Sequence, residues 1–199
     1  MSDYKGIEGS KVRSFFATQD YEVYALFNNK DEVINIQSDF AKSSVSVNIH
    51  EIRQLIEKSG ETDFTDFHNH PTSKYGVQMF SPQDVKGYVD FATGGKVTEK
   101  KYKKRYFNLQ FSTTDTTIQK INTYKVQTQC GSKFKLKYTG NKTSARTKTE
   151  NFTTAYGKEF RAISSRYTAE QTTIHMIKWT ERNAPKYGFE FSSSYVPVK

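Results

Sequence analysis

Two histidines and an aspartate, all residue types that bind metal ions, occur in one short stretch of the chain, FHNHPTSKYGVQMFSPQD at residues 67–84. His68 and His70 are separated by one residue, and Asp84 follows Ser81 by three. Two imidazoles and a carboxylate can hold zinc and leave a fourth position for water, the arrangement of catalytic zinc sites. Zinc lowers the pKa of water to about 7, so the expected chemistry is hydrolysis.

A β-strand would bring the two imidazoles together. The stretch TDFTDF at residues 62–67 predicts a short strand that runs directly into His68. Side chains two residues apart on a strand point to the same face, so His68 and His70 are expected to face the same way. Pro71 would then end the pairing, because proline has no N–H to donate.

A helix that begins after Ser81 would position the third ligand. Ser81 is a good N-cap, Pro82 suits the first helical position, and Asp84 falls at the third. The positive end of the helix dipole favours an ionised carboxylate there. Taken singly, an HxH pair and an SPxD helix start are usually structural. Their order here, a strand, HxHP, a loop and SxxD opening a helix, favours a metal site instead.

Hydrolysis also needs a general base that is not itself a ligand. Glu51 and Glu57 lie on a predicted helix that would pack outside the sheet. Glu22 instead opens the apolar stretch YEVYALFN at residues 21–28, where a carboxylate needs a reason to be. The residues alone therefore make Glu22 our candidate for the general base.

The remaining patterns predict a mixed α/β (α+β) domain, in which a mixed sheet is flanked by helices. The expected strands lie at 21–28, 32–37, 62–67, near 105–112, within 117–138 and at 188–196. The expected helices lie at 48–60, from Ser81 onward and within 151–183, with a loop at 139–149. Asn48 and Gly60 should cap the first of these helices, and Thr168 with Gln171 forms a capping box. Ile174, Ile177 and Trp179 are expected to be buried.

Several general features bound the function. Cys130 is the only cysteine, so neither an intrachain disulfide nor a cysteine zinc cluster can form. The sequence has no apolar run of 18 residues, so we expect no membrane span. The first residues lack the apolar core of a cleavable signal peptide. The expected location is therefore the cytoplasm, or the exterior after export by a dedicated bacterial machine.

Positive charge is concentrated in the middle of the chain. The net charge is +9, and residues 94–149 carry fourteen Lys/Arg against two acids. Such a segment could attract nucleic acid, an anionic surface or an acidic protein. The simpler interpretation is a set of solvated strands and loops with a basic outer face.

The amino-acid sequence of this motif resembles that of a known protein family. HNHP followed by SPQD, with an acid upstream, is similar to the signature of JAMM/MPN-type zinc metalloproteases, and the HNHP spelling is similar to the bacterial RadC-like branch. The stretches EVYALFNNKDEVI and NIHEIRQLIEKS are similar to the family's strand-turn-strand and first helix. The resemblance covers roughly residues 15–130. It implies a cytidine-deaminase-like core that cleaves peptide or isopeptide bonds.

The resemblance also implies a role for each residue of the motif. His68, His70 and Asp84 would bind Zn²⁺, Glu22 would be the general acid/base, and Ser81 would stabilise the oxyanion. It implies a metalloprotease core at residues 1–135, with residues 136–199 as a helical extension packed on it in one compact domain.

The C-terminal part resembles, more weakly, JAMM-like modules of bacterial toxins. This predicts a toxin or effector with a protein or peptide substrate and an immunity partner. The alternative is a RadC-like protein that associates with nucleic acid through residues 94–149.

Overall fold

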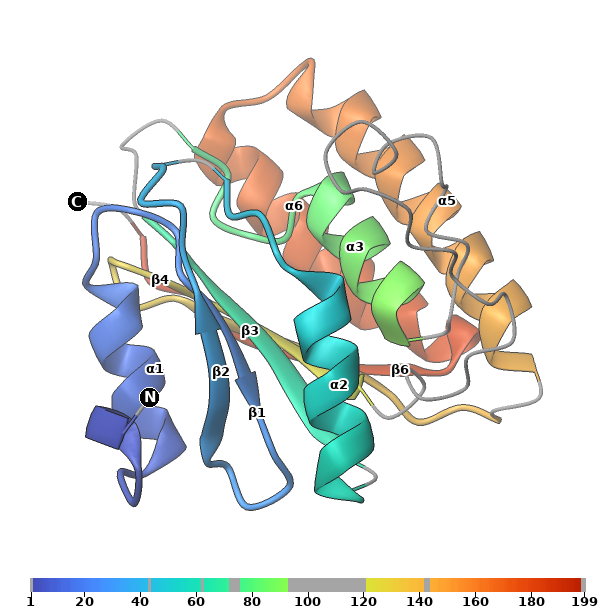
Figure 1. Ribbon diagram of the computed structural model, residues 1–199. Coiled ribbons are helices and arrows are strands. Elements are labelled where there is room, and N and C mark those ends of the chain that lie inside the picture. Colours follow the sequence, from blue (N-terminus) through green and yellow to red (C-terminus); the bar gives the residue numbers. More distant parts are fainter. Residues whose placement is uncertain are drawn as a thin grey trace, which may run out of the picture.

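A computed structural model describes residues 2–42, 44–61, 63–71, 76–92, 121–141 and 144–197 of the chain. These residues form a six-stranded sheet in the order β2-β1-β3-β4-β5-β6 (Figure 1). The strands are β1 Tyr24–Phe27, β2 Val33–Gln37, β3 Phe64–His70, β4 Ile121–Thr128, β5 Lys133–Tyr138 and β6 Phe189–Ser194. Only β3 and β4 are paired in parallel, and the other neighbours are antiparallel. The predicted mixed sheet with helices is confirmed.

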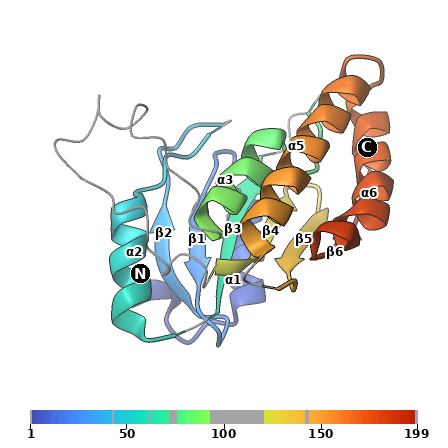
Figure 2. The ribbon, with the colours of Figure 1, turned by 90° about the vertical axis from the view of Figure 1, so that its right-hand side faces the viewer.

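Helices cover the two faces of this sheet unequally. The described α-helices are α1 Gly9–Ala17, α2 Ile49–Ser59, α3 Pro82–Ala92, α5 Ala145–Ser164 and α6 Ala169–Asn183, and short 3₁₀ helices lie at Ser2–Tyr4 and Ala184–Tyr187. The larger core joins the sheet to α2, α3, α5 and α6. A smaller core, built on Val12 and Phe16, joins α1 to the other face. Figure 2 shows α3 between α2 and α5 over the sheet.

Strand β3 is central, and its alternation sorts its residues between the two cores. Phe64 lies in the larger core, whereas Phe67 lies in the smaller core against α1. Because side chains alternate along a strand, His68 and His70 share the face of Phe64. The predicted strand is therefore confirmed, and it continues through both histidines to position 70.

Local capping signals predicted two helices well. The side chain of Asn48 accepts the N–H of Glu51 at the start of α2, and Gly60 ends that helix in the left-handed conformation. Thr168 and Gln171 form the predicted capping box at the start of α6. These motifs depend on residues close together in sequence, so their geometry is fixed locally.

Two predictions about helices were wrong, and one helix was not predicted. The loop predicted at 139–149 ends earlier than expected, because α5 begins at Ala145, and Ser144 makes no side-chain cap there. Thr149 in this helix is buried, and its hydroxyl donates to the Ala145 carbonyl. Helix α1 was not predicted: its buried positions follow helical spacing, but two of the five are Gly9 and Arg13, which do not read as apolar. Ile174 is exposed, because the buried side of α6 is formed largely by threonines, together with Met176 and Ile177.

The C-terminal part contributes strands as well as helices. The boundary expected at residues 135 and 136 falls inside β5, and β6 pairs with β5 at the edge of the same sheet. The strand expected near residues 105–112 lies outside the described residues. Among the described residues, no helix is both long and apolar enough to cross a membrane.

Candidate metal centre

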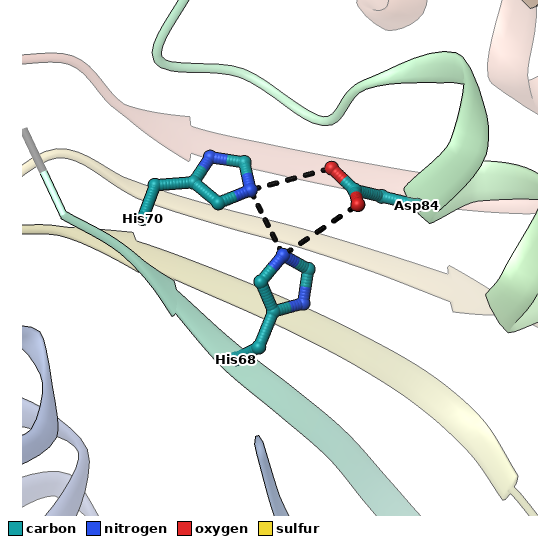
Figure 3. Close-up of side chains that lie close together, drawn as sticks. All are labelled: His68, His70 and Asp84. Carbon is teal, nitrogen blue, oxygen red and sulfur yellow. Dashed lines mark hydrogen bonds and ion pairs between the residues drawn. The ribbon is translucent and has the colours of Figure 1, made fainter. Parts of the chain in front are cut away.

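The end of β3 and the start of α3 meet above the larger core. His68 and His70 project from the last residues of the strand, and Asp84 projects from the first turn of α3 (Figure 3). Their facing atoms are close together: the two Nε2 atoms are 2.8 Å apart. The Asp84 oxygens lie 3.3 Å from Nε2 of His70 and 3.7 Å from Nε2 of His68. All three ligand atoms fall within 4.8 Å of one another, so the trio could hold a metal ion.

Asp84 is fixed by its helix start. The backbone N–H of Ser81 donates to Oδ2 of Asp84 at 2.7 Å, and the backbone N–H of Asp84 donates to the Ser81 hydroxyl at 3.1 Å. This reciprocal pair is a capping box with aspartate in the third helical position. The same short motif therefore begins the helix and aims the carboxylate at the imidazoles. Ser81 lies beside the site through this cap.

Each imidazole is held on its far side by a second group. Nδ1 of His70 lies 3.3 Å from the carbonyl oxygen of Gln78, so Nδ1 carries the proton and Nε2 presents its lone pair to the site. Nδ1 of His68 lies 2.8 Å from the Tyr124 hydroxyl, which can either donate or accept. His68 can therefore donate from Nε2 to His70, or turn its Nε2 lone pair to a cation and donate to Tyr124 instead.

Burial and the nearby charges make the three groups electrostatically unequal. Burial lowers the pKa of His68 to about 4, against the opposing effect of Asp84, so this ring is neutral at pH 7. Burial also acts to lower the pKa of His70, but the Asp84 carboxylate outweighs it and the net shift is upward. For Asp84, burial acts to raise the pKa, yet the two histidines and the Ser81 N–H lower it. The site thus holds an ionised carboxylate against imidazole nitrogens.

Glu22 lies at the edge of this cluster. Tyr24 pairs directly with His68, and just before β1 the N–H of Asn69 donates to the Val23 carbonyl, so Glu22 lies two residues before the last paired residue and near His70. Directly opposite residues on paired strands point to the same face. Burial raises the pKa of Glu22 to about 7, with His70 acting to lower it and Asp84 to raise it further. Glu22, the predicted general base, is therefore close enough to His70 and Asp84 for their charges to shift its pKa.

Asn69 orients the segment that carries Glu22. Its side chain points away from the histidines, is fully buried, and accepts the N–H of Val23 at 2.6 Å while donating to the carbonyl of Tyr21 at 2.9 Å. The residues on both sides of Glu22 are thereby fixed to β3. Asn69, the middle residue of the HNH motif, thus fixes the backbone segment that carries Glu22.

Three neighbours of the site were missed from the sequence. Gln78 and Tyr124 contact the far nitrogens of the histidines. Asp66 is buried two residues before His68 on the same face, and its burial, followed by the Asp84 charge, raises its pKa to about 8. Strand alternation could have identified Asp66. Tyr124 depends on the parallel pairing of β3 with β4, for which the sequence carries no local signal.

The donor set fits zinc. Neutral imidazoles and carboxylates are common zinc ligands. A histidine that binds a metal usually donates its other ring N–H to a carbonyl, as His70 does to Gln78. Ca²⁺ and Mg²⁺ prefer sites made of oxygen ligands. The residues present therefore match a nitrogen-binding transition metal better than an alkaline-earth ion.

His175 lies in a different contact from this site. Nε2 of His175 lies 2.6 Å from Glu159 across the α5–α6 contact, with both side chains partly exposed. His175 therefore makes an ion pair or hydrogen bond to a carboxylate. The side chain of His50 lies outside the described part of the chain.

The fold and the cluster together define a mixed-sheet protein with a candidate metal centre. Neither protein-family models, curated proteins nor solved structures gave a match to this chain.

Proposed function

We propose that this protein is a zinc-dependent hydrolase of peptide or isopeptide bonds. The observation that carries the proposal is the convergence of His68, His70 and Asp84 within 4.8 Å, with Glu22 beside them. Three protein ligands and an adjacent acid that is not a ligand are the elements such a reaction requires. The resemblance of HNHP and SPQD to the JAMM/MPN signature supports the same reaction class.

Each residue has a distinct task in this reaction. His68, His70 and Asp84 would hold the ion, which when bound acidifies water and polarises the scissile carbonyl. Glu22 would take the proton from the attacking water and return it to the leaving amine. A pKa of about 7 suits this exchange, because the carboxylate and the acid are both populated near neutral pH.

Ser81 would assist at the scissile carbonyl. Its hydroxyl oxygen accepts the N–H of Asp84, which leaves the hydroxyl proton as a donor. A donor aimed at the developing oxyanion stabilises the transition state more than the substrate. The cap and the catalytic role are therefore compatible in one side chain.

The wider biological role rests on sequence resemblance alone. A bacterial toxin or effector with a protein substrate and an immunity partner remains the prediction, as does its location in the cytoplasm or outside the cell.

The proposal is tested first by metal and then by cleavage. We expect purified wild-type protein to bind zinc at one ion per chain by inductively coupled plasma mass spectrometry, and Asp84→Ala to lose it. Glu159→Gln removes a carboxylate that also touches a histidine, at a site remote in sequence, and should keep the zinc. Wild-type protein that binds no stoichiometric metal after zinc loading would contradict the proposal.

Cleavage separates Glu22 from the ligands. On a library of peptides and isopeptide-linked substrates, Glu22→Gln should lose at least about 100-fold in turnover, the contribution typical of general acid–base catalysis. The same variant should retain zinc and its circular dichroism spectrum. Glu22→Gln with wild-type turnover would remove Glu22 from the mechanism.

A second candidate function, association with nucleic acid, is favoured by one surface of the sheet. Phe134 and Leu136 of β5 face the larger core, so the alternating lysines of that strand face the opposite side. Lys135 lies directly opposite Lys125 of β4, and like charges in this position destabilise a sheet. We name the basic row Lys125, Lys133, Lys135 and Lys137. A row that tolerates such repulsion is suited to an anionic partner.

The basic row makes this alternative measurable. Replacing Lys133, Lys135 and Lys137 with glutamine should weaken binding of a labelled DNA duplex. For each phosphate that the protein no longer neutralises, the slope of log affinity against log salt should become shallower by about 0.9. The control replaces three exposed lysines of α5 and α6, Lys148, Lys158 and Lys178, with glutamine at the same net charge. Equal effects in the two triple variants would rule out the basic row as a binding surface.

A further inference from the structure

A buried polar network lies behind His70, on the side away from Asp84. Its centre is Gln78, a buried residue that lies shortly before the start of α3. The backbone carbonyl of Gln78 accepts Nδ1–H of His70 at 3.3 Å. Gln78 is thus the group that decides which nitrogen of His70 faces the cluster.

Gln78 is itself held from two directions. Its backbone N–H donates to the hydroxyl of Thr173 on α6 at 3.1 Å. Its side-chain oxygen accepts Ser132 Oγ at 2.6 Å, Cys130 Sγ at 2.9 Å and Thr128 Oγ1 at 3.4 Å, all from the end of β4 and the turn into β5. Ser132 and Thr173 are at most 1% exposed, so these bonds are made away from water.

The network reaches the end of the chain as well. The Ser132 hydroxyl accepts the N–H of Val196 at 2.8 Å, just after β6. In addition, the N–H of Gln129 donates to the carbonyl of His70 at 3.4 Å. Segments distant in sequence therefore meet at Gln78, directly behind one imidazole of the site.

We propose that Gln78 is a positioning residue for metal binding, and that Thr173 and Ser132 hold it in place. This inference rests on the proposed metal site. The carbonyl of Gln78 keeps the proton of His70 on Nδ1 and the Nε2 lone pair aimed at the ion. Groups of this kind orient the ring and raise its basicity, and their loss typically weakens metal affinity by about 10–100-fold.

Thr173→Val is the sharpest test, because valine keeps the shape and removes the acceptor for the Gln78 N–H. Thr180→Val is a matched control on the same helix. Both threonines are buried, and both donate to the carbonyl four residues earlier, at 2.8 Å for Thr173 and 2.7 Å for Thr180. Both variants therefore remove the same kind of hydrogen bond within α6, and only Thr173 touches Gln78.

The measurements are the zinc dissociation constant, from competition with a chelator, and the midpoint of thermal unfolding of the metal-free protein. Thr173→Val should weaken zinc binding by about 10-fold or more, Thr173→Ser should restore it, and Thr180→Val should bind like wild type. Ser132→Ala, which acts from the opposite side, should also weaken zinc binding and serves if Thr173→Val does not fold.

The outcomes separate two failures. If wild-type protein binds zinc and Thr173→Val and Ser132→Ala bind it as tightly, the role of Gln78 is wrong and the proposed function stands. If the wild type binds no zinc, both fail together. Equal losses of thermal stability in the two valine variants, with zinc affinity unchanged, would assign Thr173 to packing of α6 alone.

Discussion

Two histidine–carboxylate contacts in this protein differ in what surrounds them. His175 and Glu159 are 2.6 Å apart between α5 and α6, and about a third of each side chain is exposed. His70 and Asp84 are 3.3 Å apart, more deeply buried, and share the space with a second imidazole. The first contact joins one imidazole and one carboxylate that are both partly exposed to solvent. The second brings three ligand atoms to one point.

The difference lies in the supporting groups rather than in the residue types. Asp84 is fixed by a helix cap, His70 by the Gln78 carbonyl and His68 by Tyr124. A buried charged or polar group that lacks a partner costs free energy. A buried polar cluster is therefore stable only where each of its groups has a hydrogen-bond or charge partner. A histidine beside an acid indicates a metal site only when other elements aim both at the same space.

The largest expected effect is stabilisation by zinc. Zinc at about 100 times its dissociation constant should raise the free energy of unfolding by about 2.7 kcal/mol, which is roughly 5–10 °C in the thermal midpoint of a chain this size. His70→Ala should abolish this rise, whereas His175→Ala should keep it. Differential scanning fluorimetry with and without zinc measures both. Loss of the rise in His175→Ala would show that the comparison between the two contacts is mistaken.

An intermediate effect is expected from Asp66, the buried acid next to the cluster. Burial and the Asp84 charge raise the pKa of Asp66 to about 8. The folded protein therefore holds a proton on Asp66 that the unfolded chain releases near pH 4. Stability should therefore fall as pH rises between these values, by up to about 1.4 kcal/mol per pH unit for one group.

Asparagine at this position cannot ionise. As the pH rises from 5 to 6.5, Asp66→Asn should gain roughly 2 kcal/mol relative to wild type, measured by urea unfolding of both metal-free proteins. Parallel stability curves for the two proteins would mean that Asp66 is ionised in the folded state, and the cluster would then hold more negative charge than we infer.

The smallest effect is expected at the exposed pair. Glu159→Gln should change the free energy of unfolding by less than about 1 kcal/mol, since solvent screens partly exposed ion pairs. Urea unfolding at low and high salt gives the value and its screening. A cost of several kcal/mol would place this pair among the buried networks and remove the contrast with the metal centre.

Much of the fold and of the site could be predicted because the signals are local. The alternation of β3 puts His68 and His70 on one face, and the SxxD cap sets the direction of Asp84. Helix α5 was placed too late, because its start has no side-chain cap and the threonines at 147 and 149 are weak helix formers. The first helix was missed because a glycine and an arginine occupy two of its five buried positions, which weakens the apolar pattern.

The sequence by itself determined which side chains share a strand face and which carboxylate caps a helix, because these relations span a few residues and follow from backbone geometry. Strand pairing and helix packing, by contrast, place Tyr124 and Gln78 behind the two imidazoles and bring Glu22 near His70 and Asp84. Those contacts depend on the strand order and on how helices distant in sequence pack. Burial of the two apolar cores fixes both together.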